Sequence, residues 1–204
     1  MLNEAPHESP ATSIVVVMVV LASQSPRRRE LLTLAGIPFV VRVAGVAEIR
    51  SQSELASDYV KRLALEKARA IEYSPGELIL AADTTVVVDN GHLEEVVLEK
   101  PTDRADARRM MELLSGRTHR VLTGICLRGE GVDLVDVALT MVRFAPLSPI
   151  EIDEYVDSGE PMDKAGGYAI QGRAAKFVES IEGCYFNVMG LPISLVYQHL
   201  KRFQ

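Results

Sequence analysis

Arginines 27–29 follow a turn that carries two serine hydroxyls, those of Ser23 and Ser25. The pattern predicts a helix that begins at Pro26, so the arginines fall in its first turn, where the helix dipole is positive and acidic side chains are preferred. Free backbone N–H groups, hydroxyls and guanidinium groups at such a turn can bind a phosphate. The alternative is that the arginines point outward and pair with Glu30 or other surface acids.

Three further charged residues lie at positions where their charge has no evident structural purpose. Asp83 interrupts an apolar stretch, so it is either an acceptor for nearby backbone N–H groups or a metal ligand or base. Lys67 follows Leu63 by four residues on a predicted helix and so falls on its buried face, where it must snorkel or meet a charge. Lys100, fixed by Pro101, is either a phosphate contact or an ordinary lysine at a strand end.

The loop 159–172 combines glycines with a polar amide. Gly166, Gly167 and Gly172 would let the backbone approach a ligand closely, and Gln171 could read a base edge through its donor and acceptor. Taken alone, this is also an ordinary glycine-bearing loop.

Cysteines and histidines do not form a metal site or a catalytic triad. Cys126 and Cys184 are far apart, which suits free thiols in a reducing compartment, and we expect a cytoplasmic protein. The four histidines are scattered, without the i, i+4 spacing of a helical metal pair. A participating metal must therefore be held by carboxylates, which favours magnesium or manganese.

Length and composition limit the class of protein to which the chain can belong. The chain has 204 residues, 48% of them hydrophobic and 25% charged, and a net charge of −6, which excludes a disordered body and a general nucleic-acid polymer binder. The longest apolar run, 14–22, is too short for a membrane span of about 20 residues. We expect residues 1–13 to form a flexible tail rather than a signal peptide, followed by a single domain over 14–204.

Hydrophobic periodicity predicts a mixed α/β sheet with flanking helices. Ser25 is expected to cap the first helix, and Ser148 with Glu151 to form a capping box. The predicted strands are 14–21, 78–82, 86–88, 118–127, 132–144, 168–170 and 176–181, with a break at 83–85 and a hairpin turn at 90–91. The predicted helices are 26–35, 54–70, 104–114, 150–157 and one that follows Pro192.

Seven segments, taken in order, resemble the Maf family of nucleoside triphosphate pyrophosphatases. They are LASQSPRRRELL (21–32), RLALEKA (62–68), AADTTV (81–86), LEKP (98–101), LSGRTHRVLTG (114–124), GEPMDKAGGYAIQG (159–172) and NVMGLP (187–192). The resemblance implies a fold shared with inosine triphosphate pyrophosphatases, with two lobes around a cleft, and frequently a homodimer. It also implies metal-dependent cleavage between the α and β phosphates, which yields a monophosphate and pyrophosphate.

The resemblance also assigns roles to individual residues. The family's proton-accepting aspartate matches Asp83, which would also hold a divalent metal together with Glu48. Positions linked to substrate choice match Arg27, Thr84 and Gln171. Other polar positions of the family's cleft match Ser23, Arg28, Lys67, Lys100 and Lys164, of which Lys67 and Lys100 are expected to assist catalysis.

Within the family, Thr84, the segment 99–101 and the segment 168–172 are similar to the branch that prefers dTTP and UTP. Two features depart from the family pattern: Ala47 replaces one member of an acidic pair beside Glu48, and the hairpin 90–97 is longer than usual. Two other functions stay open at this point. One is a 7-methyl-GTP-type pyrophosphatase, and the other is a nucleotide-sensing regulator of septum formation without significant turnover.

Overall fold

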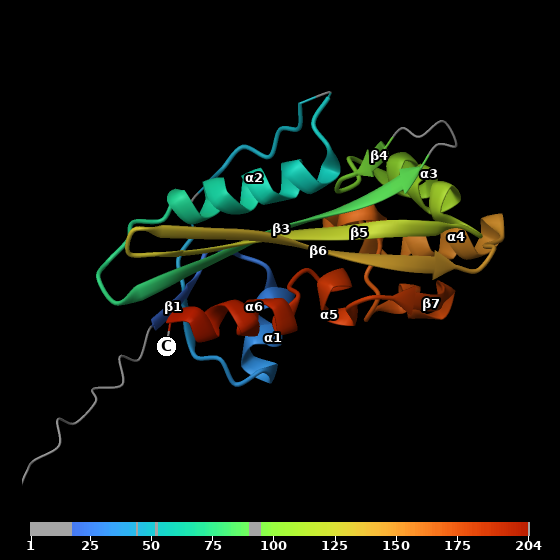
Figure 1. The fold of residues 1–204 in the computed structure, drawn as a ribbon. Helices are drawn as coiled ribbons and strands as arrows, with labels where there is room; N and C mark the ends of the chain where they lie inside the picture. Colours follow the sequence, from blue (N-terminus) through green and yellow to red (C-terminus); the bar gives the residue numbers. More distant parts are fainter. Residues whose placement is uncertain (1–17, 44, 52, 90–94, 204) are drawn as a thin grey trace, which may run out of the picture.

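Three parallel strands joined by two helices form the N-terminal half of the sheet. The structure, a computed structural model, describes residues 18–43, 45–51, 53–89 and 95–203. In chain order the elements are β1 (Met18–Leu21), α1 (Pro26–Leu34), β2 (Phe39–Val41), α2 (Ala56–Arg69) and β3 (Glu77–Asp89). Both β2 and β3 pair in parallel with β1. Because the two crossovers run in opposite directions along the sheet, their common handedness puts α1 and α2 on opposite faces (Figure 1).

Long antiparallel strands complete the sheet, in the order β2-β1-β3-β5-β6-β7, with β4 paired to β3 outside this path. The remaining elements are β4 (Glu95–Leu98), α3 (Arg104–Leu114), β5 (Thr118–Gly129), β6 (Val132–Phe144), α4 (Pro149–Asp157), the 3₁₀ helices η1 (Glu160–Asp163), η2 (Ala165–Gly167) and η3 (Arg173–Phe177), β7 (Val178–Glu182), α5 (Tyr185–Val188), α6 (Ile193–Leu200) and η4 (Lys201–Phe203). None of the helices in the described ranges is long and apolar enough to cross a bilayer.

β3 has two different partners along one of its edges. β1 pairs with it as far as Leu80, and β4 pairs with it from Val86 onward. On this edge the intervening residues 81–85 have no strand partner within the described part of the chain, whereas β5 covers the opposite edge without a break. The sheet therefore has a gap, and Asp83 lies at its centre.

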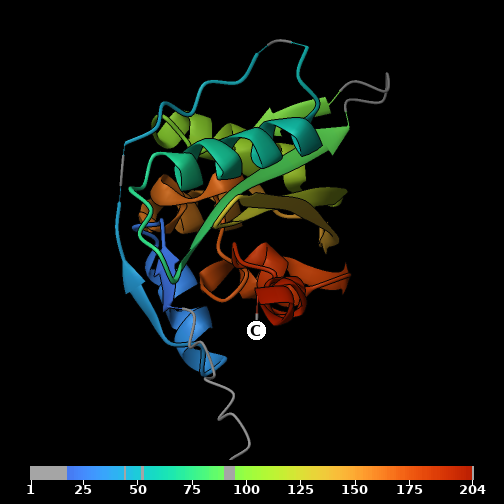
Figure 2. The ribbon, with the colours of Figure 1, turned by 60° about the vertical axis from the view of Figure 1, so that its left-hand side comes forward.

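Two hydrophobic cores pack against the long strands and form two lobes. The first joins β1, α1 and α6 through residues such as Leu21, Leu32 and Val196. The second joins α3, α4 and the loop before β7, and it includes Met111 and Phe144. Along β3, residues 78, 80 and 82 contribute to the first core and residues 86 and 88 to the second, so the lobes meet at 83–85. Figure 2 shows α2 on one side of the sheet and α6 on the other.

Several sequence predictions need correction. β3 is continuous, because a single carboxylate facing a gap does not interrupt the hydrogen bonding of the other edge. The Ser25 side chain does not cap α1. Residues 168–170 form no strand and lie instead between two 3₁₀ turns. The short elements β2 and α5 were not predicted.

Other predictions are confirmed. α3 has the predicted bounds, and the capping box of Ser148 and Glu151 is present. The first residues of the predicted strand 14–21 and the turn at 90–91 lie outside the described residues, as does the tail 1–13, although β3 and β4 pair antiparallel on either side of that turn.

Candidate active site

The gap in the sheet opens into a cleft of about 750 Å³ between the two lobes. Its walls come from the turn between β1 and α1, the segment before α2, β3, the end of β4 and the loop 162–171. All of the residues predicted from the sequence line it: Ser23, Arg27, Arg28, Glu48, Lys67, Asp83, Thr84, Lys100, Lys164 and Gln171. The structure thus brings together side chains from segments that are distant in the sequence.

Lys67 joins two carboxylates at the floor of the cleft. Its Nζ lies 2.7 Å from Oδ1 of Asp83 and 2.5 Å from Oε1 of Glu48. Residues 79 and 81 of β3 pack against α2, and the alternation of the strand directs Asp83 toward the same helix. The lysine on the buried face of α2 therefore meets a charge, which is one of the two outcomes that the sequence left open.

The two carboxylates differ in their pKa shifts. Burial raises the pKa of Asp83 above its usual value, and the charges of Lys67 and Arg28 offset this only in part. Burial also opposes the charge of Glu48, but there the hydrogen bond and charge of Lys67 prevail and hold the pKa below its usual range. Asp83 is thus a better proton acceptor than an ordinary aspartate, and Glu48 is more firmly ionised than an ordinary glutamate.

Arg28 is held by three protein acceptors at the N-terminus of α1. Its Nε donates to the carbonyl oxygen of Gly190 (2.8 Å), Nη1 donates to Oγ of Ser23 (3.1 Å) and Nη2 donates to Oγ1 of Thr84 (3.2 Å). A guanidinium group has five N–H donors, so the remaining ones can bind an anion in the cleft.

Thr84 is held in place by hydrogen bonds that run from its hydroxyl through the hydroxyl of Thr123 to the backbone carbonyl of Asn187. Thr123 Oγ1 donates to the carbonyl oxygen of Asn187 (3.1 Å), which uses its single proton. In the 3.0 Å contact between the two threonine hydroxyls, Thr84 must therefore be the donor. Because Thr84 already donates to Thr123 and accepts from Arg28, it positions Arg28 and has no proton left for a ligand.

Arg27 and Lys164 face each other across the cleft through Asp163. Arg27 Nη1 lies 3.6 Å from Oδ2 of Asp163, and the Lys164 ammonium forms an ion pair with the same carboxylate. The side chain of Asp163 is 70% exposed, so solvent weakens both pairs. An incoming phosphate would compete with this carboxylate for the two cations.

Lys100 and Gln171 stand at the more open rim of the cleft. Lys100 is 63% exposed and lies 3.9 Å from Oε2 of Glu48. Gln171 is exposed and follows three buried residues, 168–170. The first of them, Tyr168, is fixed by a 2.8 Å hydrogen bond between its hydroxyl and Nε2 of His119, so the loop that presents Gln171 is anchored in the second core.

Two glycines of this loop are required by close packing. Gly166 has a φ of +68°, and a Cβ there would lie 2.7 Å from a methyl carbon of Val86. A Cβ at Gly172 would lie 2.5 Å from Oε1 of Glu160. These glycines let the loop lie close to β3 and to Glu160.

The cleft is also lined by polar residues to which the sequence assigned no individual role, among them Tyr59, Glu99 and Asp163. The Tyr59 hydroxyl donates to Oε1 of Glu99 at 2.8 Å, which joins α2 to the segment that carries Lys100. Helical spacing places Tyr59 on the buried face of α2 with Leu63, and only its phenolic hydroxyl signals a polar contact. Glu99 and Asp163 stand beside the predicted lysines, which is the signal that could have found them.

The carboxylates fit a divalent cation that is bound together with a phosphate ligand. Within the described ranges, no three His, Cys, Asp or Glu residues gather as a ready-made metal site. Magnesium often binds through one or two carboxylates and completes its shell with water and substrate phosphates. Asp83 and Glu48, which share Lys67, supply such a pair of hard oxygen donors.

Comparison with known proteins assigns the family. A family model described as Maf-like protein matches residues 18–203. The chain belongs to the Maf family. A relative from Symbiobacterium thermophilum, named dTTP/UTP pyrophosphatase, is 52% identical over 186 residues, which cover 91% of this chain and 93% of the relative. Another from an Anaeromyxobacter species, with the same name, is 53% identical over 90% of this chain and 88% of its own length.

Comparison with solved structures finds a similar fold in a Ham1 protein. The Ham1 protein of Staphylococcus aureus superposes with a TM-score of 0.54 at 13% identity, covering 92% of this chain and 100% of that chain. At this identity the likeness shows a shared fold. It supports the mixed sheet with flanking helices that the sequence predicts.

Proposed function

We propose that the chain hydrolyses nucleoside triphosphates between the α and β phosphates, releasing the monophosphate and pyrophosphate, with dTTP and UTP as preferred substrates. The observation that carries the proposal is the position of Asp83, a buried carboxylate with a raised pKa at the centre of a cleft lined with cations. Relatives about half identical over nine-tenths of this chain are named dTTP/UTP pyrophosphatase, which supports both the reaction and the base preference.

The cations of the cleft provide for binding of the triphosphate. Arg27 and Arg28 stand at the N-terminus of α1, where backbone N–H groups also favour an anion. Lys164 faces them from the other lobe, and Lys67 and Lys100 lie near the two carboxylates. Their charge offsets the repulsion that slows attack on a phosphoryl group, which is the largest contribution that a protein makes to this chemistry.

Asp83 is proposed to orient and deprotonate the attacking water. The water oxygen forms a bond to the α phosphorus, its proton passes to the carboxylate, and the bond from the α phosphorus to the bridging oxygen breaks. Pyrophosphate leaves with the electron pair of that bond, stabilised by the lysines. Lys67 keeps Asp83 ionised and oriented between turnovers.

A divalent cation, magnesium or manganese, is proposed to bind to Asp83 and Glu48 and to neutralise phosphate charge when present. Gln171 is proposed to recognise uracil or thymine, because its amide offers the donor and acceptor that complement the imide edge of these bases. Arg27 and Thr84 would contribute to substrate choice, the latter by holding Arg28.

A nucleotide-sensing regulator without turnover is the second candidate, and 7-methyl-GTP is the alternative substrate. A binding protein has no need of a buried base beside the phosphates, so Asp83 favours the enzyme.

The test is to incubate the purified chain with magnesium or manganese and dTTP, UTP, CTP, 7-methyl-GTP or ITP, and to separate the products by ion exchange, with Asp83→Asn as the control. We expect monophosphate and pyrophosphate from dTTP and UTP, and none with the control. Faster turnover of 7-methyl-GTP or ITP would overturn the base preference, and binding without turnover would overturn the enzyme.

A further inference from the structure

Glu48 lies in a segment that regular secondary structure does not position. Among the described residues 42, 43, 45–51 and 53–55, between β2 and α2, there is neither helix nor strand. Val46 packs beside α2, but the side chain of Ile49 is exposed, so apolar burial does not anchor the chain immediately after Glu48. Another contact must fix the backbone at this point.

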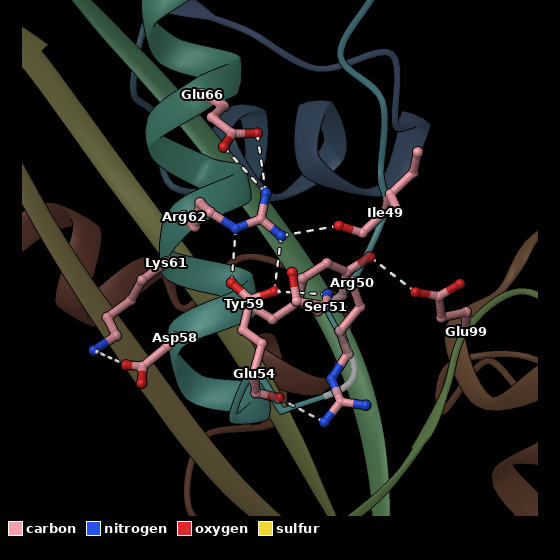
Figure 3. Close-up of polar contacts among 10 residues, drawn as sticks. All are labelled: Ile49, Arg50, Ser51, Glu54, Asp58, Tyr59, Lys61, Arg62, Glu66 and Glu99. Atoms are coloured by element: carbon pink, nitrogen blue, oxygen red, sulfur yellow. Dashed lines mark hydrogen bonds and ion pairs between the residues drawn. The ribbon is translucent and has the colours of Figure 1, made fainter.

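Arg62 of α2 provides this contact (Figure 3). Its Nη2 donates to the carbonyl oxygen of Ile49 at 3.0 Å, one residue from Glu48. The same guanidinium grips the Glu54 carboxylate with two bonds, from Nε at 2.7 Å and from Nη2 at 2.8 Å. Arg62 thereby ties both ends of the segment 49–54 to one helix.

Glu54 extends the clamp into the segment itself. Its carboxylate accepts from the backbone N–H of Ser51 at 3.3 Å, and its carbonyl oxygen accepts from Nη2 of Arg50 at 2.6 Å. Arg62 also bonds Glu66 one turn further along α2, which holds the guanidinium in place (Figure 3). The Glu54 side chain is only 13% exposed, and the Arg62 bonds lower its pKa.

The ordinary surface pair on the same helix gives a contrast. Lys61 and Asp58 lie 2.8 Å apart with side chains 37% and 57% exposed, and Figure 3 shows them bonded to each other rather than to the residues of the segment 49–54 that it draws. Such exposed ion pairs contribute little to the stability of the fold. The Arg62 side chain is 35% exposed, much like that of Lys61, but its partner Glu54 is only 13% exposed, and two hydrogen bonds make the clamp directional.

We propose that Arg62 is a positioning residue for Glu48: through the Ile49 carbonyl and Glu54, it sets the Glu48 carboxylate against Lys67 and Asp83, and so determines how tightly the carboxylate pair binds a divalent cation. The inference rests on the proposed function, which gives that pair its role. Arg62 and Lys67 are five residues apart on one helix, about 7.5 Å along its axis. One rigid element therefore fixes both the partner of Asp83 and the backbone beside Glu48.

A double-mutant cycle tests this proposal. The variants are Arg62→Gln, Glu48→Gln and their combination, with Lys61→Gln as the matched control that removes a neighbouring positive charge. The first readout is the dissociation constant of Mn²⁺, measured by electron paramagnetic resonance without turnover. The second readout is the kcat and KM for dTTP as the magnesium concentration is varied. A thermal melt of each variant shows that it is folded at the assay temperature.

We expect Arg62→Gln to weaken Mn²⁺ binding and to raise the magnesium requirement about tenfold, while Lys61→Gln stays within about twofold of the parent chain. In the Glu48→Gln background, Arg62→Gln should add little, because residues that act through one another are not additive. Arg62→Lys should be intermediate, since lysine can donate to one acceptor but cannot form the two-bond clamp.

Equal effects of Arg62→Gln with and without Glu48 would overturn the proposal, as would unchanged Mn²⁺ binding in Arg62→Gln. If Arg62→Gln does not fold, Glu54→Gln weakens the same clamp, and its failure to weaken Mn²⁺ binding would have the same meaning. Absence of turnover in the parent chain would refute the proposed function, whereas the cycle on Mn²⁺ binding would still be measurable.

Discussion

Asp83 and Lys67 form an ion pair that is shielded from solvent, with 2.7 Å between Oδ1 and Nζ and side chains only 10% and 15% exposed. The strand contributes the carboxylate and the helix packed on it contributes the ammonium group, so the pair bridges β3 and α2 at the gap in the sheet. Burial nevertheless raises the pKa of Asp83. One lysine, shared with Glu48, does not fully compensate for the lost hydration of the carboxylate.

Asp83→Asn should abolish most activity without weakening the fold. Loss of a general base costs about 10²- to 10⁴-fold, so we expect kcat for dTTP to fall at least ~100-fold. A carboxyl whose pKa is raised by folding contributes stability below its unfolded pKa and loses that contribution as the pH rises through its folded pKa. At pH 7 the neutral asparagine should therefore leave the melting temperature equal or higher. Pyrophosphate release and a thermal melt check both parts, and a clear drop in melting temperature would contradict the second.

The acid limb of the pH profile should report Asp83. Because the carboxylate is the active form and its pKa is raised, kcat should fall on acidification with a midpoint above the ordinary aspartate value of about 4. The charge of Lys67 lowers this pKa, so Lys67→Gln should move the midpoint to higher pH. The profile of kcat from pH 4 to 9 measures the shift, with Lys61→Gln as the control. An unmoved midpoint would show that another group titrates.

Gln171 should control base preference rather than the rate of the chemistry. Gln171→Ala removes the amide but leaves the anchoring residues 168–170, so we expect the ratio of kcat/KM for dTTP over ITP to fall about tenfold. The measurement is kcat/KM for both nucleotides under the same conditions. An equal loss for both would instead assign Gln171 to phosphate or sugar binding.

Local patterns in the sequence identify the chemistry of the site but not its assembly. Helical spacing places Lys67 on a buried face, and an acid in an apolar run marks Asp83, so each is recognisable alone. That β1 and β4 share one edge of β3 and leave a gap at Asp83 depends on long-range pairing, which hydrophobic periodicity does not specify. For the same reason the acid was interpreted as a break in the strand.

Residues that act through other residues escaped the sequence analysis. The contact between Thr84 and Thr123 exists because they are directly paired in the register of β3 and β5. Arg62 reaches a backbone carbonyl in a segment without periodicity, and no pattern signals it. The packing role of the glycines at 166 and 172 was not predicted, because the sequence does not reveal which neighbour requires their small size.

Thr123→Val tests the hydroxyl chain that ends at Arg28. The replacement keeps the shape of this fully buried side chain but removes the donor to the Asn187 carbonyl and the acceptor for Thr84. A buried group left without its partner costs about 1–3 kcal/mol, and Arg28 loses a fixed acceptor. We expect that loss of stability in urea unfolding, together with a several-fold higher KM for dTTP. The exposed Thr118→Val on the same strand should change neither, and a normal KM in Thr123→Val would separate Thr84 from Arg28.

Gly124→Ala should disturb the seating of α2 on the sheet. Any Cβ at this position of β5 would overlap the carbonyl group of Val60 and lie 2.7 Å from the backbone nitrogen of Lys61. Both are helix backbone atoms that cannot rotate away, so the whole helix must shift, and Lys67 must move with it. Overpacking of this kind costs about 1–3 kcal/mol, measurable by urea unfolding, and we expect kcat to fall as the pair with Asp83 is disturbed.

Gly45→Ala, where an added Cβ meets nothing within 4 Å, is the stability control. A Gly124→Ala chain with parent-like stability would show that α2 can lift from β5 at little cost, and its kcat would then reveal whether catalysis depends on that contact.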